Sequence, residues 1–543
     1  MKREIETADA SPRVHHHRCY RVKATDRFIV LGRTGTELID LSGGKNDRNC
    51  WVRGTCQYGV MPANGLLYAP PHACGCYMQA KLAGMWALGP EPAPWPEVDA
   101  SDRLESLGEA PTAGPSGETD WPTYRHDRAR SGTTRAETGG KLSPAWDAKV
   151  GRKLSAPVVV GDMVYVADIA THTVHAVSLQ NGDTIWRYTA AGAVDSPPTF
   201  YEGMVIFGSG DGRVHCLDAS DGEPVWRFLA APCDRRVVSR GRLESVWPVH
   251  GSVLVQNDSV WVVAGRSSYL DGGFACYRLD PHTGEVQAQG RLNTEGVETG
   301  AGGELYGRSG RMKGALDDIL SGNGETAFMR QMQLGPDFQQ LPPEFHLFSM
   351  VGFLDDSWFS RSYWFYGSMM WGYYRGWAMS ADYSPFGRIL SIAPEDVAYG
   401  FRRPGHGTGI EGRNQYFFYK ATFHPDVARE RLPDPNKYNW KGAERQGCVT
   451  EHWRTKLPIW VRAMAVAGDA VVVAGPHAPG SRDTAAALAG KKGSRLMLLS
   501  REDGEALQEI ELSSPPAWDA LAVVPGRVVV SGTDGRLRCF AGE

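Results

Sequence analysis

Residues 203–228 read GMVIFGSGDGRVHCLDASDGEPVWRF, in which short runs rich in Val, Ile and Phe are separated by glycine-containing turns and closed by a tryptophan. The pairs Asp211-Gly212 and Asp221-Gly222 suit two-residue hairpin turns, because such turns need positive φ at their central positions and Asp and Gly tolerate it. The stretch therefore predicts short antiparallel strands joined by tight turns.

The same pattern recurs along the chain at a spacing of about 40 residues. Trp146, Trp186 and Trp226 are each 40 residues apart, and an Asn-Gly or Asp-Gly pair precedes each of the last two. The strand pattern returns at 533–540, close to the end of the chain. A unit of a few strands cannot cover both faces of its own sheet, so repeated units must pack against one another. The repeat predicts an all-β protein, a β-propeller.

The remaining units are less regular. A third unit at 241–290 carries a loop insertion, and we expect two further blades between 291 and 455. Two blades are also predicted at 15–90, followed by a Pro/Gly-rich linker at 91–118 and the main propeller at 119–543. We predict about eight four-stranded blades. Two arrangements stay open: the first two blades close the ring, or they are the tail of a second propeller.

The pattern of short strands, glycine turns and tryptophan is similar to a known type of repeat. The pattern at 203–228 resembles the pyrroloquinoline quinone (PQQ)-like repeat of quinoprotein alcohol dehydrogenases and of the propeller lipoprotein that assists outer-membrane barrel assembly. Residues 120–132, DWPTYRHDRARSG, are similar to the lead-in that precedes the first repeat in bacterial PQQ-like proteins. The resemblance is good over 145–290 and 457–541. It implies a periplasmic or exported location, although Met1 to Val14 contain no apolar signal-peptide segment.

Composition argues against two classes of partner. The chain has 58 basic and 62 acidic residues, with a formal net charge of −4, so no basic surface for nucleic acid is predicted. The sequence contains no run of 18 or more apolar residues, so no membrane-spanning helix is predicted. The expected partners are small-molecule, carbohydrate or protein ligands.

Candidate binding residues come from places where the chain enters a blade near the ring axis. Residues 243–252 stand where the earlier blades have Ser-Ala-Pro or Ser-Pro-Pro, and polar side chains there would line the axial face. In residues 353–364, aromatic rings stand beside carboxylates and arginine, which suits a carbohydrate or another ring-shaped ligand. A structural alternative has Trp247 packing between blades and His250 bonding a backbone carbonyl. The predicted axial ligand-binding residues are Asp195, Glu244, Trp247, His250, Arg266, Asp355 and Asp356.

Five cysteines lie within 58 residues near the N-terminus: Cys19, Cys50, Cys56, Cys74 and Cys76. One hypothesis makes Cys19, Cys56, Cys74 and Cys76 a tetrahedral zinc site. The spacing of Cys74 and Cys76 is tighter than the usual metal-binding pair of cysteines, so we favour disulfides or free thiols.

Two functions remain after these steps. The first is a non-catalytic binding or scaffolding module that uses the axial face of the propeller. The second is an oxidoreductase or lyase with a quinone or a metal in the central funnel. The resemblance implies PQQ with Ca²⁺ and two adjacent disulfide-bonded cysteines for the enzymes, whereas this chain has Cys74-Gly75-Cys76, so PQQ is not favoured. Because the repeat identifies a fold and not an activity, the sequence does not decide whether the protein is an enzyme.

Overall fold

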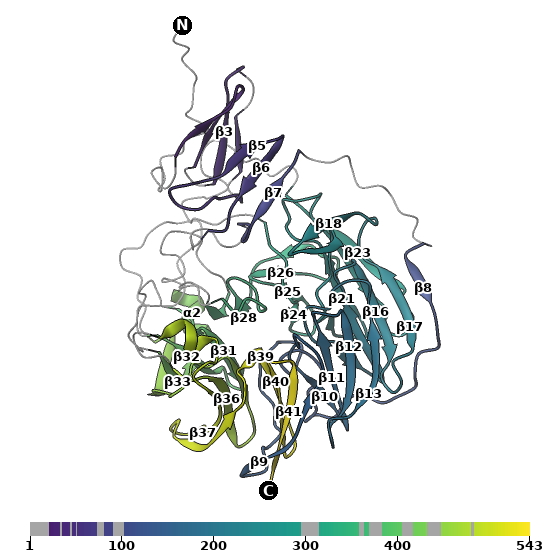
Figure 1. Cartoon of the computed structure of the whole chain (residues 1–543), viewed down its shortest axis with the longest axis vertical. Coiled ribbons are helices and arrows are strands. Elements are labelled where there is room, and N and C mark those ends of the chain that lie inside the picture. Colours follow the sequence, from purple (N-terminus) through teal and green to yellow (C-terminus); the bar gives the residue numbers. More distant parts are fainter. Residues whose placement is uncertain are drawn as a thin grey trace.

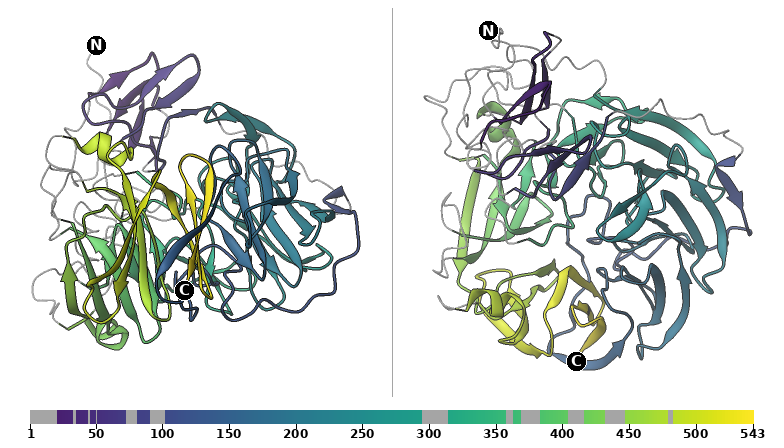
Figure 2. Two further views of the ribbon diagram at one scale, coloured as in Figure 1. Left: turned by 60° about the horizontal axis from the view of Figure 1, so that its bottom comes forward. Right: turned by 45° about the horizontal axis from the view of Figure 1, so that its top comes forward.

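The chain folds into antiparallel sheets that stand side by side around a common centre (Figure 1, Figure 2). The computed structural model describes residues 21–32, 35–43, 46–49, 51–72, 81–90, 102–294, 314–357, 363–368, 383–403, 416–431, 447–478 and 483–543. Within them, α2 (Pro425–Arg431) and α3 (Thr484–Leu488) are short, and almost all other regular structure is strand. The prediction of an all-β propeller is confirmed.

The sheets follow one another along the chain, and each begins with its innermost strand. The first comprises β10 (Val158–Val160), β11 (Met163–Asp168), β12 (Thr173–Ser178) and β13 (Thr184–Thr189). The second comprises β14 (Thr199–Tyr201), β15 (Met204–Gly208), β16 (Arg213–Asp218), β17 (Pro224–Leu229) and, at its outer edge, β8 (Leu104–Ser106). The third comprises β20 (Leu254–Val255), β21 (Val260–Ala264), β22 (Phe274–Leu279) and β23 (Val286–Leu292). A separate hairpin, β18 (Arg236–Ser239) and β19 (Arg242–Ser245), precedes the third sheet.

The series continues through the region where the sequence pattern blurs. The next sheets are β24 (Ser321–Gly322), β25 (Ala327–Met329), β26 (Met332–Leu334), β27 (Gln340–Leu341), and then β28 (His346–Ser349), β29 (Trp364–Gly367), β30 (Phe386–Gly387). They are followed by β31 (Ile389–Ala393), β32 (Val397–Arg402), β33 (Phe417–Phe423), β34 (Val449–Thr455), and by β35 (Ala463–Val466), β36 (Ala470–Pro476), β37 (Ser494–Ser500), β38 (Ala506–Leu512).

The last sheet joins the two ends of the series. It holds β39 (Pro516–Val524), β40 (Arg527–Gly532) and β41 (Arg536–Gly542), and its outer strand is β9 (Leu142–Lys149) from before the first sheet. Trp146 pairs with Cys539 in this register. The innermost strands β10 and β39 also lie against each other. The first and last sheets of the series are thus in direct contact, with none of the described residues of 21–90 between their innermost strands.

The N-terminal residues form two small sheets outside this series. One holds β1 (Lys23–Ala24), β2 (Phe28–Leu31), β3 (Thr36–Asp40) and β4 (Asp47–Asn49), and the other holds β5 (Met61–Ala63), β6 (Leu66–Ala69) and β7 (Trp86–Leu88). Their apolar side chains pack against Leu316, and Trp51 stacks on Tyr269 with ring centroids 5.3 Å apart. Strand β8 lies inside the stretch 91–118 that was predicted as a linker. This segment is a strand because its backbone pairs with the edge strand β17.

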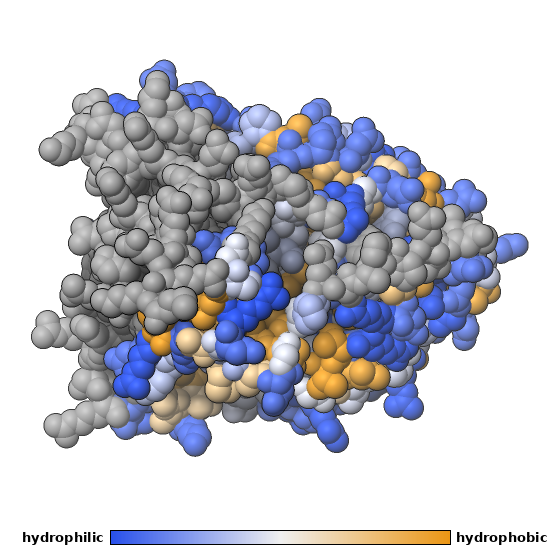
Figure 3. Space-filling view, turned by 90° about the horizontal axis from the view of Figure 1, so that it is seen from above, coloured by the Kyte–Doolittle hydropathy of each residue, from blue (hydrophilic) through white to orange (hydrophobic). Residues whose placement is uncertain are grey.

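Strand position within a sheet explains the sequence pattern. In β12, which is covered on both faces, residues 173–177 are all buried, whereas in the outer strand β13 the indole of Trp186 is buried and its neighbours Ile185 and Arg187 are exposed. On the face seen from above in Figure 3, blue hydrophilic residues surround smaller orange hydrophobic patches. Among the described residues, no helix has the length and hydropathy needed to cross a membrane.

The repeated tryptophans connect neighbouring sheets. Trp186 lies in the first sheet, and its Nε1 donates a hydrogen bond of 2.9 Å to the carbonyl oxygen of Ala219 in the second. Gly222, in the turn of that second sheet, has φ +80°, and a Cβ there would lie 2.7 Å from the Trp186 ring. Trp146 and Trp226 make equivalent bonds to Leu179 and Pro281, 2.8 and 2.9 Å long. What recurs about every 40 residues is therefore a contact between neighbouring sheets as well as a pattern of strands.

Candidate functional site

Residues 119–138, the lead-in segment, run across the central channel at one end of the innermost strands. Trp121 exchanges backbone hydrogen bonds with Val159 of β10, and the carbonyl oxygen of Ser131 accepts from Ile392 of β31. Further backbone hydrogen bonds join the segment to Phe200 of β14, Gly322 of β24 and Val466 of β35. Because these strands belong to sheets all around the ring, the lead-in segment closes one end of the channel.

Two buried arginines fix the lead-in segment. The Arg125 guanidinium forms an ion pair of 2.8 Å with Asp519 and donates to the carbonyl oxygen of Leu390 at 2.6 Å. Arg130 donates to the carbonyl oxygens of Leu320 and Val253 at 2.9 and 3.1 Å, and burial lowers its pKa to about 10. The sequence identified these residues only as a marker of where repeats begin. Their contact with the innermost strands makes them a structural support for whatever lies beside them.

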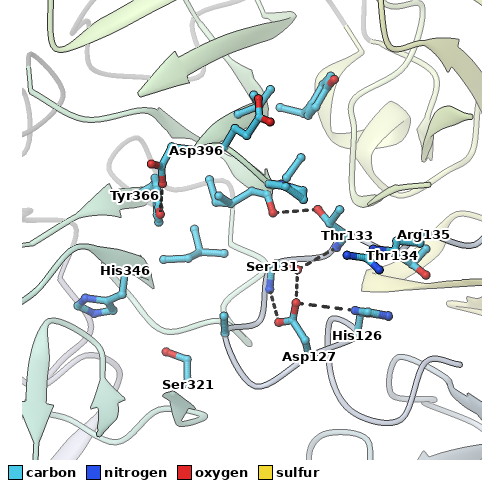
Figure 4. Close-up of a pocket in the computed structure, with 18 of the residues that line it drawn as sticks. His126, Asp127, Ser131, Thr133, Thr134, Arg135, Ser321, His346, Tyr366 and Asp396 are labelled. Atoms are coloured by element: carbon cyan, nitrogen blue, oxygen red, sulfur yellow. Dashed lines mark hydrogen bonds and ion pairs between the residues drawn. The ribbon is translucent and has the colours of Figure 1, made fainter. Parts of the chain in front are cut away.

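A cavity of about 1160 Å³, the lead-in cavity, opens beside this segment (Figure 4). One wall is the lead-in segment itself, from His126 to Arg135. The other walls come from the sheets that begin with β24, β28 and β31, and from Gly468 and Arg501 of the next sheet. Apolar side chains form a large part of the lining: Ala129, Phe328, Phe345, Leu347, Ile392, Ala393, Pro394 and Val397.

Most carboxylates of the lead-in cavity already have partners. Asp127 accepts from the Ser131 hydroxyl at 2.5 Å and the Ser131 amide at 3.0 Å. Burial would raise the pKa of Asp127, but His126 and Ser131 outweigh it, and the pKa lies below its ordinary value. The Tyr366 hydroxyl donates to Asp396 at 2.5 Å, and burial together with this carboxylate raises the pKa of Tyr366. Figure 4 shows both contacts at the edge of the cavity.

The predicted axial residues lie at the other end of the innermost strands and form separate pairs. His250 Nδ1 is 2.6 Å from Asp195 Oδ2, and its Nε2 is 3.4 Å from Asp317 Oδ2. Burial alone would lower the pKa of His250, but the two carboxylates raise it well above its ordinary value. Arg266 forms an ion pair of 2.7 Å with Glu244.

The other predicted residues take different places. Trp247 is 2% exposed and belongs to the apolar core of the second and third sheets, where its Nε1 donates to the carbonyl oxygen of Asp271 at 3.1 Å. Asp356 pairs with Arg462 at 2.7 Å, and Asp355 accepts from the Ser357 amide at 2.8 Å. These contacts match the structural alternative for Trp247, while His250 bonds carboxylates and not a backbone carbonyl.

Sequence reasoning missed the acidic pair Asp317 and Asp318. Asp318 is buried, and its Oδ1 accepts from the amides of Ile319 and Phe353, both at 2.9 Å. Its Oδ2 is buried with no hydrogen-bond partner in the described structure, and burial raises its pKa to about 6. The two aspartates follow a stretch without clear repeat pattern, so no spacing in the sequence places them beside His250.

The residues present do not fit a calcium–quinone site. Among the described residues, the axial carboxylates Asp195, Glu244 and Asp356 are each paired with a histidine or an arginine, and only Asp318 keeps a buried oxygen without a hydrogen bond, which is too few free oxygen ligands for a hard cation. Across the described ranges, no three His, Cys, Asp or Glu side chains come together in a metal-binding group. Of the predicted thiolate set, Cys56 is an exposed free thiol, while Cys19, Cys74 and Cys76 lie outside the described residues.

The fold and the repeats define a β-propeller with PQQ-like repeats. Residues 128–304 match a PQQ-like repeat family model described as outer membrane protein assembly factor BamB. The comparison with curated proteins gave no match.

Solved structures with a similar fold include two natural proteins. Quinohemoprotein alcohol dehydrogenase ADHIIG from Pseudomonas putida HK5 is 13% identical, with 78% of this chain and 80% of that chain covered and a TM-score of 0.46. BamB from Moraxella catarrhalis is 12% identical, with 74% of this chain and 98% of that chain covered and a TM-score of 0.38.

Proposed function

We propose that this protein is a non-catalytic binding propeller and that the lead-in cavity is its ligand site. The observation that carries the proposal is a cavity of about 1160 Å³ whose wall is the lead-in segment. Ligand sites in proteins are preformed concave regions with a largely apolar lining and a few polar groups, typically about 300–1,000 Å³. Arg125 and Arg130 hold this wall in place from the buried side, so the cavity is preformed.

The proposed architecture is a ring of eight blades with an accessory unit. The uninterrupted series of sheets from β10 to β41 and the shared sheet of β9 and β41 support eight blades within residues 119–543. Residues 21–90 form the accessory unit, which is supported by their separate sheets and their packing on Leu316. The description of the matched family model, an outer membrane assembly factor, favours an exported location and supports a protein partner as well as a small ligand.

The alternative, an oxidoreductase with its site in the central funnel, would use the axial end that holds His250. His250 and Asp195 have the contact that general acid–base chemistry needs. The binding function has better support because the carboxylates at that end are neutralised by cations, whereas the lead-in cavity has room for a ligand.

Blocking the lead-in cavity tests the proposed function. Ala129 is exposed and lines the cavity, so Ala129→Trp places a bulky ring on the cavity wall without disturbing the core. The matched control is Ala506→Trp, on the exposed outer strand β38. Ligand-observed NMR with a fragment library on the full chain should give hits that Ala129→Trp abolishes and Ala506→Trp keeps. An absence of hits, or hits that Ala129→Trp leaves unchanged, would contradict the proposal.

A further inference from the structure

We infer that the lead-in cavity recognises an organic anion with an aromatic or apolar body, and that Lys420 and Arg501 bind its anionic group. This inference rests on the proposed function and adds the class of ligand. It starts from two basic side chains that line the same end of the cavity, one on β33 and one directly after β37.

The two cations are held side by side. Lys420 Nζ donates to the carbonyl oxygen of Arg501 at 3.0 Å, and Arg501 Nη1 donates to the carbonyl oxygens of Ala467 and Gly468 at 3.2 and 3.0 Å. Both cations lie 5.9 Å from the centroid of the Tyr399 ring. Backbone carbonyls therefore orient both side chains without neutralising their charge.

No counter-charge accompanies this pair. In the part of the chain that the structure describes, neither Lys420 nor Arg501 forms an ion pair, whereas the nearby Arg495 contacts both Glu509 and Glu511. Two positive charges that line one part of a cavity without a carboxylate partner raise the local potential and attract an anion. The pair therefore favours a ligand that brings a negative charge.

The carboxylates of the cavity leave that positive charge available. Asp127 is bonded to Ser131, and Asp396 accepts from Tyr366. Glu118 lies 3.5 Å from Arg135, with both side chains largely exposed. Of the lining carboxylates, Glu395 alone has no hydrogen bond or ion pair among the described residues. Asp127 and Asp396 accept hydrogen bonds but keep their negative charge, so the lining as a whole is not positive, and only its part at Lys420 and Arg501 favours an anion.

Another part of the cavity lining is rich in aromatic rings. Phe328 and His346 are stacked with centroids 4.0 Å apart, and Phe345 and Tyr366 complete this aromatic part. Apolar and aromatic parts of a ligand bind such surfaces through burial and ring stacking. A small molecule with a negative group at one end and a ring at the other matches both parts of the lining.

Titration calorimetry with charged and neutral probes tests this inference. We expect 1-naphthalenesulfonate to bind the full chain at least tenfold more tightly than the uncharged 1-naphthol, and the difference to shrink as salt is raised. Lys420→Gln and Arg501→Gln should each weaken the sulfonate at least threefold and leave the naphthol unchanged. Glu395→Gln should tighten the sulfonate. The control Lys492→Gln, at an exposed lysine paired with Asp483 away from the cavity, should change nothing.

The outcomes separate the two proposals. Equal binding of both probes, blocked by Ala129→Trp, would overturn the anion site and leave the binding function standing. Failure of both probes to bind at millimolar concentration would overturn the anion site, and the fragment screen would then decide the function independently. Thermal unfolding of each variant shows whether a loss of binding reflects a loss of fold.

Discussion

At the scale of single residues, the lead-in segment depends on charge burial. Arg125 and Asp519 are each 2% exposed, and the Tyr124 hydroxyl also donates to Asp519 at 2.8 Å. Burial raises the pKa of Asp519 despite the adjacent Arg125, so the carboxylate stays charged only because the guanidinium and the Tyr124 hydroxyl lie beside it. Each of the two charges therefore depends on the other, and the ion pair attaches the lead-in segment to β39.

Replacing Asp519 should destabilise the protein strongly. Asp519→Ala leaves a buried guanidinium without its counter-charge, which costs about 3–5 kcal/mol. The exposed pair of Lys492 and Asp483 is the control, and Asp483→Asn should cost less than about 1 kcal/mol. Denaturant unfolding of both variants measures the difference, and equal costs would show that the buried pair does not hold the segment.

His250 should make stability depend on pH. Asp195 and Asp317 raise its pKa in the folded state, so folding favours the protonated ring. This stabilisation is complete below the ordinary imidazole pKa of about 6.5 and is lost as the pH rises through the higher folded pKa. Asp318 titrates lower, near pH 6. We expect the melting temperature to fall above neutral pH and His250→Gln to flatten that fall. An unchanged slope in the variant would exclude His250 as its source.

Contacts between single residues were the feature that the sequence predicted least well. The composition of 243–252 drew attention to His250, and its position beside Asp195 is a contact between consecutive sheets that the repeat spacing implies. Asp317, Asp318 and Lys420 lie in or after the irregular stretches of 291–455, where no clear repeat register relates them to the ring, and Arg501 lies in a regular repeat whose spacing does not reveal its neighbour Lys420. Their neighbours depend on loop paths, which local sequence does not determine.

At the scale of elements, the hairpin turn and the tryptophan act together. The turn glycine of one sheet supports the indole of the sheet before it, as Gly222 does for Trp186, Gly284 for Trp226 and Gly182 for Trp146. The sequence predicted the turns and the tryptophans as separate signals. It did not predict that they meet, because that contact joins neighbouring blades across about 30 residues or more.

Substitution of Gly222 should therefore lower the free energy of unfolding by more than backbone strain alone would. Gly222→Val combines φ of +80° with a contact of 2.7 Å to the Trp186 ring, and we expect a loss of about 2–5 kcal/mol. Gly241 has a similar φ of +76° with no atom within 4 Å of an added Cβ, so Gly241→Val measures the strain alone, about 1–2 kcal/mol. Equal losses in thermal unfolding would show that the indole contact contributes nothing.

At the scale of the whole molecule, the ends of the repeat series meet twice. Strand β9 completes the sheet of β41, and the lead-in segment bonds the innermost strands on both sides of the channel. The sequence placed the last repeat at the end of the chain, but it did not predict that the strand of Trp146 completes the sheet of that repeat, because pairing between residues almost 400 positions apart leaves no local trace. The lead-in segment that bonds these innermost strands is also a wall of the lead-in cavity, which links the fold to the proposed function.

Hydrogen–deuterium exchange of the full chain with and without 1-naphthalenesulfonate is the most direct test of that link. We expect the bound probe to slow exchange in residues 126–135 and 394–399, which both contribute to the lining of the lead-in cavity. Protection confined to residues 243–252 and 353–357, none of which lines that cavity, would contradict this expectation.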